Sequence, residues 1–496
     1  MPLLVLGLDG VNWDILKPLL KDLPNLSRLI NEGASSTLIT TIPPSTGPAW
    51  ASFATGKNPG KHGVVDFFEN PSDSNSRIVT SRTIKSPRIW EMMPDKKCLI
   101  INMPFTYPLT EINGIMVSSF FTPPGEPFAP PGVLEELKEI GYKPGVEFEK
   151  YGGTEEKAAA HRHDIYKDQF YITKKRVEAF KRLYKKDKWD FLFMLFKGTD
   201  IMHHYFIDDH EKLLEYYKLV DKSIKEILDL FEGPIDVLIL SDHGGHKANT
   251  RTFYVNSWLK KKGFIKESRK IALLKKGKKV KDLLSKLGIS LVKDLKKTKK
   301  ASLMSKVVRK ATEGSPIILS SWGLYINEPD SEKLKAVQKE IKEELKELVD
   351  DKGDKVFKYV FMREEIYYGE KLSLAPHVVY VPFENYEVNS SYLSGKANKL
   401  FVDKVPFLSG EHNSAVKGIF IAHGPSIDKT TINNVSILDL APTILHFFNC
   451  PIPEDIDGEV LKDIFKKNSD PSKREVILGK IDSKKDLQNA ISKIKL

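Results

Sequence analysis

The sequence predicts an α/β protein, a three-layer sandwich with a mostly parallel central sheet between helices and with cap insertions. Four continuous apolar runs of strand length predict the sheet: Leu3–Leu8, Cys98–Asn102, Asp190–Phe196 and Ile235–Leu240. Such runs are typical of parallel strands that are buried on both faces. Stretches with helical periodicity separate them, and strands that alternate with helices indicate an α/β architecture.

The predicted helices have apolar residues three and four positions apart. In the first half of the chain they are Ile15–Leu20, Asn25–Asn31, Pro87–Met93, Leu134–Ile140, Glu155–Tyr184 and His210–Phe231. In the second half, strand-like runs at Ile317–Ile326, His377–Val381 and Gly418–Ala422 alternate with helices at Ser331–Val349 and Ser436–Phe448. We expect one core domain over residues 1–462, with insertions at 66–84, 107–189 and 260–312, and a C-terminal helical extension over 463–496.

The composition narrows the class of protein. The 496 residues are 41% hydrophobic and 29% charged, which is ordinary for a globular protein. No apolar run approaches the roughly 18–20 residues that span a bilayer, and the start, MPLLVLGLDG, lacks the cationic region of a signal peptide. We therefore expect a cytoplasmic protein. Two cysteines, Cys98 and Cys450, support neither a disulfide framework nor a cysteine-type zinc site. Abundant Lys and Glu with little Gln suggest a thermophile source.

The net charge of +11 comes from one segment of the chain. Lys260 to Lys310 holds 20 Lys or Arg residues against three acidic residues, a charge of +17, and the remainder therefore carries −6. One interpretation is a solvated helical arm. The other is an arm that attracts an anionic partner beside the site, and a basic amphipathic helix suits an anionic membrane surface to which the protein would bind peripherally. Phe264 is the segment's one aromatic residue, so no specific nucleic acid is expected.

The stretch Thr40–Val64, TTIPPSTGPAWASFATGKNPGKHGV, places two hydroxyl residues where a loop enters a predicted helix. Ser45 and Thr46 come just before Gly47 and Pro48, and proline fits the first turn of a helix because its missing N–H would be unpaired there. The free backbone N–H groups and the positive end of the helix dipole then face the hydroxyl groups. This setting suits a nucleophile that attacks phosphorus, and an ordinary helix cap uses the same residue types.

Carboxylates and imidazoles follow several strand ends and loops, in an arrangement that suits metal ions. They are Asp9, the pair Asp200 and His204 on one helical turn, the adjacent pair Asp242 and His243, and His412 ahead of the strand-like run at Gly418–Ala422. Such donors without a thiolate suit zinc, manganese, iron or another first-row divalent ion. Two ions roughly 3.5–4 Å apart can stabilise both oxygens of an in-line displacement. Singly, each residue could also be a capped turn or a solvated surface histidine.

Together and in this order, the motifs resemble the alkaline phosphatase superfamily, specifically its type I phosphodiesterase/nucleotide pyrophosphatase family. The resemblance rests on Leu8-Asp9-Gly10, Thr46-Gly47-Pro48, Pro59-Gly60-Lys61-His62-Gly63, the spacing of Asp200 to His204, Ser241-Asp242-His243-Gly244, Gly410-Glu411-His412, and Asp439 to Leu445 with Asp457-Gly458. It covers residues 1–255 and 315–462. The order and number of motifs make it specific.

The resemblance implies an alkaline-phosphatase-like fold and a metal-dependent phosphodiesterase that acts on a small phosphodiester or nucleotide-like substrate with two divalent metal ions, zinc first among them. Thr46 rather than Ser45 would be the nucleophile, and the Gly47 N–H would help to hold a phosphoryl oxygen. One ion would take Asp9, Asp242, His243 and the Thr46 oxygen, and the other Asp200, His204 and His412.

The chain departs from the family pattern at Phe67, which stands where nucleotide pyrophosphatases have an Asn that helps to bind the phosphoryl oxygen. No aromatic pair for a nucleobase is recognisable in the sequence, and the Cys-x-Pro-x-Arg signature of sulfatases is missing. The alternatives are a phosphomutase or phosphonate hydrolase of the same superfamily, and a non-catalytic protein that binds an anionic ligand or a membrane surface.

Overall fold

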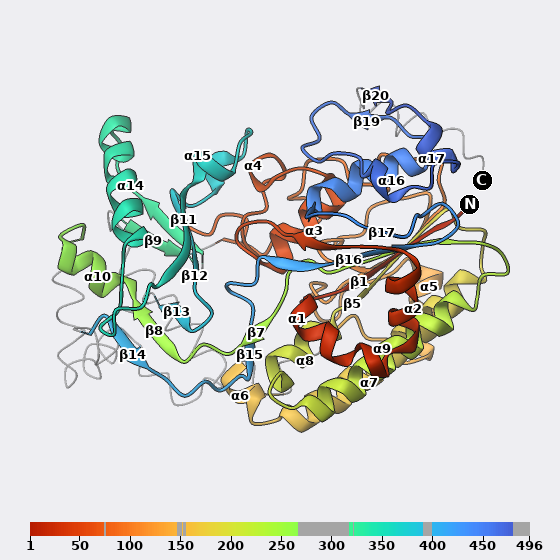
Figure 1. Ribbon diagram of the computed structural model, residues 1–496, viewed down its shortest axis with the longest axis horizontal. Helices are drawn as coiled ribbons and strands as arrows, with labels where there is room; N and C mark the ends of the chain where they lie inside the picture. The colour runs from red at the N-terminus through yellow and green to blue at the C-terminus, as the bar shows by residue number, and fades with distance from the viewer. Residues whose placement is uncertain are drawn as a thin grey trace.

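The computed structural model describes residues 1–73, 76–145, 151, 155–265, 317–320, 322–389 and 399–479. Its larger lobe is built on one sheet (Figure 1). The described strands of this sheet are β1 (Leu3–Leu8), β2 (Ala34–Ile39), β3 (Cys98–Met103), β4 (Gly114–Ser118), β5 (Phe191–Phe196), β6 (Asp236–Leu240), β16 (Lys417–His423), β17 (Thr430–Thr431) and β18 (Val435–Ser436). Their order is β17-β2-β16-β6-β1-β5-β3-β4, with β18 also beside β2.

Strand pairing confirms that the central sheet is mostly parallel. β1 pairs in parallel with β5 and β6, and β3 pairs in parallel with β4 and β5. Of the described strands in this sheet, β16 alone runs the other way, antiparallel to β2 and β6. Every residue of β1 and β5 is buried, as their continuous apolar runs predict for strands covered on both faces.

Helices cover both faces of the sheet and complete the three predicted layers (Figure 1). Alternate residues of β1 serve two cores, with Leu4 and Leu6 in one and Leu3 and Val5 in the other. The first face carries α1 (Trp13–Leu16), the 3₁₀ helix η1 (Lys17–Asp22), α2 (Pro24–Glu32), α5 (Pro131–Glu139), α6 (Glu155–Ala159), α7 (Arg162–Tyr184), α8 (Gly198–Phe206) and α9 (His210–Leu228). The second face carries α3 (Thr46–Thr55), η5 (Ile437–Asp439), α16 (Leu440–Phe447) and η6 (Lys462–Ile464).

Two stretches of the larger lobe differ from the sequence-based expectation. The helix predicted at Pro87–Met93 is a series of turns, in which the Arg88 guanidinium bonds the Glu91 carboxylate. Residues 107–189, expected as an insertion, supply the edge strand β4 and the long covering helix α7. β4 begins at the exposed Gly114 and is fully buried only over its last three residues, so it lacks the apolar run that revealed the other strands.

A smaller lobe lies between β6 and β16 in the sequence (Figure 1, left). Its elements are β7 (His246–Lys247), β8 (Arg251–Tyr254), α10 (Val255–Lys262), β9 (Ile317–Ser320), β10 (Gly323–Ile326), α14 (Ser331–Lys346), β11 (Phe357–Met362), α15 (Arg363–Ile366), η4 (Leu372–Leu374), β12 (Val378–Pro382), β13 (Tyr386–Asn389), β14 (Phe401–Asp403) and β15 (Gly410–Glu411). The runs predicted at Ile317–Ile326 and His377–Val381 therefore belong to a separate antiparallel sheet, β11-β12-β10-β9, with its own core around Trp258.

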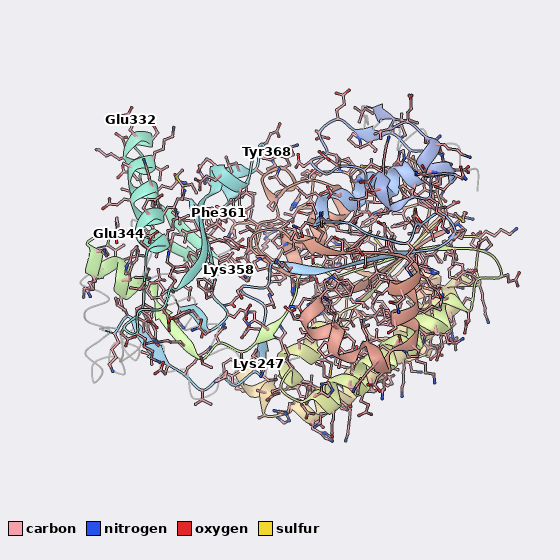
Figure 2. The ribbon with its side chains drawn as sticks, viewed as in Figure 1. Lys247, Glu332, Glu344, Lys358, Phe361 and Tyr368 are labelled. Carbon is pink, nitrogen blue, oxygen red and sulfur yellow. The ribbon has the colours of Figure 1, made fainter. Side chains whose placement is uncertain are left out.

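The two lobes touch beside the loop that precedes α3. The Tyr367 hydroxyl of the smaller lobe donates a hydrogen bond to the carbonyl of Ile42, and Tyr367 packs in one apolar cluster with Val65. The neighbouring Tyr368 ring lies 5.0 Å from Lys61 Nζ of α4 (Pro59–His62). Figure 2 shows Tyr368 on the side of this lobe that faces α4 and Glu332 at its outer end. The smaller lobe is thereby fixed against the segment that carries Ser45 and Thr46.

The structure describes only part of the predicted C-terminal extension, residues 463–496, and of the predicted basic insertion, residues 260–312. Residues 463–479 contain the one-turn helix α17 (Asp470–Lys473) and β20 (Leu478–Gly479), which pairs with β19 (Ile452–Pro453). Of the basic insertion 260–312, residues 260–265 are described, where α10 ends, and the remainder lies outside the described residues, as does 480–496. The division into domains therefore stays a prediction. Within the described residues no helix is long and apolar enough to cross a membrane.

Candidate active site

The candidate site lies at the carboxyl edge of the central sheet, where three neighbouring strands end together. β1 lies between β5 and β6 and runs parallel to both. Asp9 follows β1, Asp200 lies in the first turn of α8 after β5, and Asp242 follows β6. Ligands gather at this edge in open α/β sheets. Gly10 turns the chain with a φ of +75°, and a Cβ there would lie 2.8 Å from Asp200 Oδ1, so this turn requires glycine.

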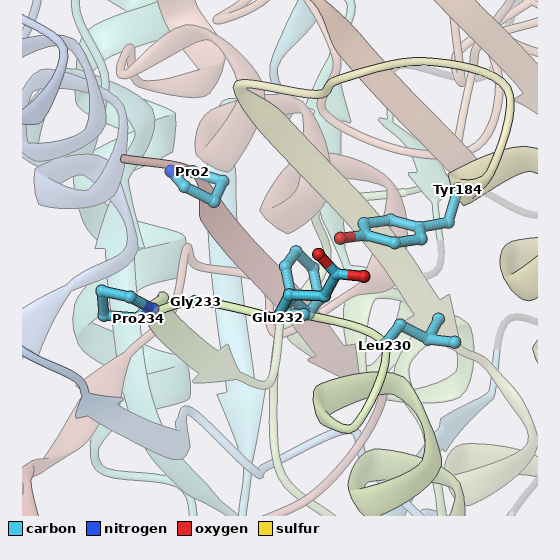
Figure 3. A pocket seen from close by; sticks show the side chains of 7 residues that line it. Pro2, Tyr184, Leu230, Glu232, Gly233 and Pro234 are labelled. Atoms are coloured by element: carbon cyan, nitrogen blue, oxygen red, sulfur yellow. The ribbon is translucent and has the colours of Figure 1, made fainter.

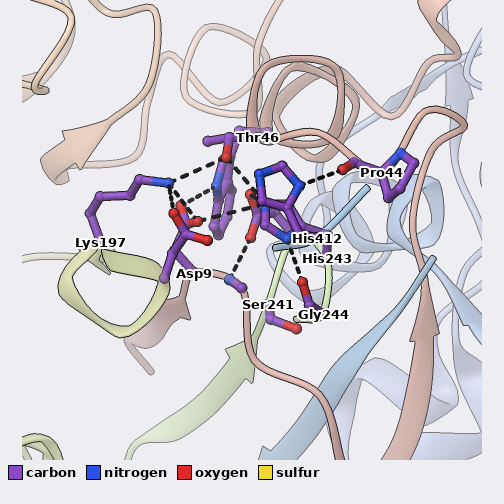
Figure 4. A network of polar contacts seen from close by, with 12 residues as sticks. Asp9, Pro44, Thr46, Lys197, Ser241, His243, Gly244 and His412 are labelled. Carbon is purple, nitrogen blue, oxygen red and sulfur yellow. Dashed lines mark hydrogen bonds and ion pairs between the residues drawn. The ribbon is translucent and has the colours of Figure 1, made fainter. Parts of the chain in front are cut away.

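One half of the site consists of Asp9, Thr46 and His243, which Figure 4 labels, together with Asp242. The Thr46 hydroxyl lies 3.2 Å from His243 Nε2. The same nitrogen lies 3.8 Å from Asp9 Oδ1 and 3.4 Å from Asp242 Oδ2. Asp9, Asp242 and His243 are fully buried and Thr46 is 2% exposed. The structure thus brings together the four residues expected to hold one ion.

The other half consists of Asp200, His204 and His412. His204 Nε2 lies 3.5 Å from Asp200 Oδ1, as their spacing of four residues on α8 predicts. The His412 ring lies 5.3 Å from the His204 ring and stacks on His243 at 4.2 Å, which joins the two halves. His412 is carried by the chain that returns from the smaller lobe, directly after β15.

The three histidines share a hydrogen-bonding pattern that is typical of metal ligands. Nδ1 of His204, His243 and His412 faces a backbone carbonyl, that of Gly410 at 3.0 Å, Gly244 at 2.8 Å and Pro44 at 3.1 Å. Because a carbonyl can only accept, each Nδ1 carries the proton, and in the neutral ring Nε2 keeps its lone pair directed into the site. A second partner that fixes the tautomer in this way is the usual support for a metal-bound histidine.

The nucleophile candidate stands at the start of α3. Ser45 is the N-cap residue, but its side chain makes no capping hydrogen bond, and its Oγ has no hydrogen-bond partner among the described residues. Thr46 is the first residue of the helix and directs its hydroxyl at His243. The first N–H groups of a helix have no acceptor within it, so those of Thr46 and Gly47 are available to an anion. The simple helix-cap interpretation is therefore not supported by the geometry.

Two residues that contact the candidate ligands were not singled out from the sequence, Lys197 and Trp50. Lys197 Nζ lies 2.8 Å from Asp9 Oδ1, 2.7 Å from Asp200 Oδ2 and 3.3 Å from Thr46 Oγ1. Trp50 Nε1 donates to Asp9 Oδ2 at 3.2 Å. A lysine directly after a buried central strand was a signal that could have found Lys197, since lysines are rarely placed so deep. Trp50 looks like any apolar residue of a helix.

Burial and neighbouring charges shift the carboxylates in different directions. Burial, with help from the adjacent Asp242, raises the pKa of Asp9 to about 7, and burial likewise raises the pKa of Asp242 to about 7. Burial acts to raise the pKa of Asp200 too, but Lys197 and the nearby histidines outweigh it and hold that pKa well below its ordinary value. Burial lowers the pKa of His243, which keeps the ring neutral.

The donors fit divalent cations. Ligand atoms of Asp200, His204 and His412 lie within 4.8 Å of one another, and so do those of Asp9, Asp200 and His243. The first set is the predicted one; the second contains Asp200 where Asp242 was predicted. Asp242 Oδ2 receives no hydrogen bond from any described residue, although it is buried. A buried carboxylate oxygen in this state, beside oriented imidazoles, matches oxygen and nitrogen coordination of a first-row ion.

The opposite end of β1 offers a useful contrast. A pocket there is lined by Pro2, Tyr184 and the loop from Leu230 to Pro234 (Figure 3). Glu232 is the one carboxylate among the residues that line it, and its volume is about 300 Å³. Of the two ends of β1, therefore, only the one at the carboxyl edge of the sheet carries a cluster of Asp and His residues among the described residues.

Comparison with known proteins agrees with this geometry. The sequence profile of the type I phosphodiesterase/nucleotide pyrophosphatase family matches residues 3–413. Human ectonucleotide pyrophosphatase/phosphodiesterase 5 is 14% identical, with a TM-score of 0.55 over 95% of this chain and 100% of that one. The murine protein, as an inactive variant in complex with AMP, is 15% identical, with a TM-score of 0.55 over 94% of this chain and 100% of that one. No curated protein sequence matches.

The profile match spans most of the chain, and the structural likeness confirms the fold that the motifs implied. The structural likeness agrees with the three-layer architecture described above. The chain therefore belongs to the type I phosphodiesterase/nucleotide pyrophosphatase family and is a metal-dependent phosphoester hydrolase of that family.

Proposed function

We propose that the protein cleaves small phosphodiesters, nucleotide-like ones included, with Thr46 as the nucleophile and with two divalent ions, zinc by preference. The observation that carries the proposal is the position of the Thr46 hydroxyl, at a helix start and 3.2 Å from His243 within a buried Asp/His cluster. A nucleophilic hydroxyl needs a neighbour that favours loss of its proton, and this cluster supplies one.

The residues that would hold the ions are those predicted from the motifs. Asp9, Asp242, His243 and the Thr46 oxygen form one set, and the other consists of Asp200, His204 and His412. In such a site, divalent ions lower the pKa of a coordinated hydroxyl and stabilise negative charge on the attacking and leaving oxygens. The carbonyls of Gly244, Gly410 and Pro44 hold the three imidazoles in the orientation that this requires.

The reaction then follows from the positions of the side chains. Thr46 Oγ1 gives its proton to solvent and forms a bond to phosphorus, the bond from phosphorus to the leaving oxygen breaks, and that oxygen takes up a proton from solvent. The N–H of Gly47 lies at the helix start, where it can donate to a non-bridging phosphoryl oxygen. Water then attacks the phosphorus of this phosphothreonine intermediate and loses a proton to solvent, the bond from phosphorus to Thr46 Oγ1 breaks, and the threonine oxygen takes up a proton, which restores the hydroxyl group and releases the phosphoryl product.

The substrate class rests on the family and on the surroundings of Thr46. A solved relative binds AMP, which supports a nucleotide-like substrate for this chain. The side of the site beside Gly47 is aromatic, since a Cβ on Gly47 would lie 3.2 Å from Phe105 Cζ and 3.5 Å from Phe67 Cδ1. Phe121 stacks on Phe105 with ring centroids 4.7 Å apart. This apolar side suits the organic part of a phosphodiester better than its charged oxygens.

The test is hydrolysis of bis-p-nitrophenyl phosphate and p-nitrophenyl phosphate by metal-free protein and after addition of Zn²⁺ or Mn²⁺. We expect metal-dependent cleavage that favours the diester and falls at least 10³-fold in Thr46→Ala, with Thr46→Ser largely active. Ser45→Ala is the matched control and should keep its activity. Loss of activity in Ser45→Ala with full activity in Thr46→Ala would move the nucleophile to Ser45.

The same assay separates the alternatives. A phosphomutase would release neither free alcohol nor inorganic phosphate from its substrate. A phosphonate hydrolase would cleave a phosphonate better than the diester, and a binding protein would cleave no ester with any metal.

We also propose that the protein lies inside the cell and binds an anionic membrane surface through residues 260–310. The charge of +17 in that segment supports this location. Flotation with phosphatidylglycerol vesicles at low salt tests it, and a protein that stays at the bottom excludes it.

A further inference from the structure

Lys197 touches the nucleophile candidate and both halves of the site at once. It lies between β5 and α8, with 16% of its side chain exposed. Its ammonium group contacts Asp9 of one half at 2.8 Å and the Thr46 hydroxyl at 3.3 Å (Figure 4). It also contacts Asp200 of the other half, at 2.7 Å. Among the described side chains, His243 and Lys197 are the two with a hydrogen bond to Thr46 Oγ1. This cation is therefore placed at the point where the phosphoryl group would react.

We propose that Lys197 is a catalytic residue, whose ammonium group binds a non-bridging oxygen of the phosphoryl group that Thr46 attacks. The proposal rests on the function proposed above. It assigns a role to a residue that none of the motifs contains and that differs in kind from the metal-binding Asp and His residues.

Geometry limits where the phosphoryl group can lie. For attack, phosphorus must approach to about 3–3.5 Å from Thr46 Oγ1. Lys197 Nζ is already 3.3 Å from the same atom, so phosphoryl oxygens around that phosphorus fall within reach of the flexible lysine side chain. On the Gly47 side the neighbours are the rings of Phe67 and Phe105, which carry no charge to offer. Among the described residues, Lys197 is thus the cationic side chain that contacts the reacting oxygen of Thr46.

Lys197 also has donors to spare once divalent ions share its carboxylate partners. An ammonium group has three N–H donors and acts as a point charge, a common arrangement for binding phosphate. Asp9 and Asp200 are both ligand candidates, so a cation bound by them weakens the hold of Lys197 on the same oxygens. The ammonium group is then repelled by the metal ions and attracted by the anionic substrate. Lys197 should therefore oppose metal binding and favour phosphate binding.

The effect on phosphate binding separates a catalytic role from a merely structural one. A lysine that only neutralises buried carboxylates would, when removed, also free them for metal ions, but it would leave the affinity for phosphate unchanged. A lysine that binds substrate would, when removed, allow tighter metal binding and weaken phosphate binding. The variant for this is Lys197→Met, with Lys197→Arg to keep the charge. Lys57→Met is the matched control, because Lys57 is a comparably buried lysine of the same lobe that pairs with Asp455, at 2.5 Å, outside the site.

The experiment combines two calorimetric titrations with rate measurements. Metal-free protein is titrated with Zn²⁺, and zinc-loaded protein is titrated with inorganic phosphate. For Lys197→Met we expect Zn²⁺ to bind at least tenfold more tightly and phosphate at least tenfold more weakly than in the wild type. The value of kcat/KM should fall at least 100-fold for p-nitrophenyl phosphate and less for bis-p-nitrophenyl phosphate, since the monoester dianion carries one more charge. Lys197→Arg should keep most of the phosphate affinity, and Lys57→Met should match the wild type throughout.

Other outcomes would overturn the assignment. If Lys197→Met binds phosphate and cleaves both esters like the wild type, the lysine has no role in the reaction. If Lys197→Met loses both zinc binding and activity, the role of the lysine is structural. If Lys197→Met fails to fold, Lys197→Arg and Lys197→Gln are compared instead, and the proposal then requires weaker phosphate binding in Lys197→Gln. A wild-type protein that binds zinc and phosphate but cleaves no ester contradicts the proposed function and not the phosphate contact.

Discussion

The two halves of the candidate active site use similar residues in different surroundings. In the half made of Asp9, Asp242 and His243 every side chain is fully buried. In the half made of Asp200, His204 and His412, 17% of the His204 side chain is exposed and His412 is half-buried. The first half gathers two carboxylates with raised pKa values, while the second has one carboxylate whose pKa is held down.

This difference shows how the fold assigns different charge states to like residues. Asp200 has a cation and imidazoles around it and stays ionised without further help. Asp9 and Asp242 are both fully buried and close enough for their negative charges to repel, so a proton or a metal ion must neutralise them. The buried half should therefore depend on its ion more strongly than the open half.

The largest effect should come from removing a ligand of the buried half. Asp242→Asn is expected to reduce metal-dependent diester cleavage at least 10³-fold, without recovery in millimolar Zn²⁺, because the ion would lose the charge that offsets its burial. His204→Gln, in the open half, should lose about 10²-fold and recover in part with added Zn²⁺, since a partly exposed ion can take water as a ligand. Rates measured across a zinc titration of both variants check this.

Equal losses with equal recovery would contradict the comparison, since the two halves would then be equivalent. Thermal melting of both metal-free variants controls for misfolding. Asp242→Asn removes one of two repelling carboxylates, so its metal-free form should melt no lower than the wild type at pH 8.

The second effect is a dependence of metal binding on pH. Asp9 and Asp242 have folded pKa values of about 7 against an ordinary 3.8, so they favour the folded state below that ordinary value and lose this contribution as the pH rises through 7. Ions bind the deprotonated carboxylates and must displace these protons below pH 7. We expect zinc affinity to rise from pH 6 to pH 8, by up to about tenfold per pH unit for each proton displaced below pH 7.

Calorimetric zinc titrations at pH 6, 7 and 8 measure this slope. Asp9→Asn removes one of the two titrating groups and should lower the slope by about one proton. A slope of zero in the wild type would mean that the buried carboxylates are ionised across the whole range.

The sequence predicted the larger lobe far better than the smaller one. Strands such as Leu3–Leu8 are buried on both faces, and this leaves a continuous apolar run in the sequence. Most strands of the smaller lobe are short, and Phe357–Met362 mixes buried, half-buried and exposed residues, so nothing in the sequence separates its sheet from the central one. Its antiparallel pairing depends on contacts between distant segments, which a periodicity analysis does not detect.

In the site, too, some residues could be recognised from the sequence by their chemical type, whereas others depend on their position in the fold. Carboxylates and imidazoles after strand ends are recognisable by type, and the structure brings those predicted residues together. Trp50 could not be assigned a role, because tryptophan is common in cores, and Lys197 was detectable only as an unusual lysine directly after a buried strand. Their roles arise from the fold, which directs both side chains at the Asp9 carboxylate. Thr46 and the two ligand sets stay predictions until the variants above are measured.

The smallest effect concerns Trp50, which contacts the Asp9 carboxylate of the buried half. Its indole N–H donates to Asp9 Oδ2, while its ring packs edge-on against Phe193, with centroids 5.7 Å apart. Trp50→Phe keeps an aromatic ring and removes the donor, so zinc should bind roughly tenfold more weakly, as is usual for partners that orient a ligand. Trp90→Phe is the matched control, because Trp90 is also buried and its Nε1 has no hydrogen-bond partner among the described residues. Both variants should melt lower, but only Trp50→Phe should change zinc affinity; an equal change in both would assign the effect to packing and not to the bond with Asp9.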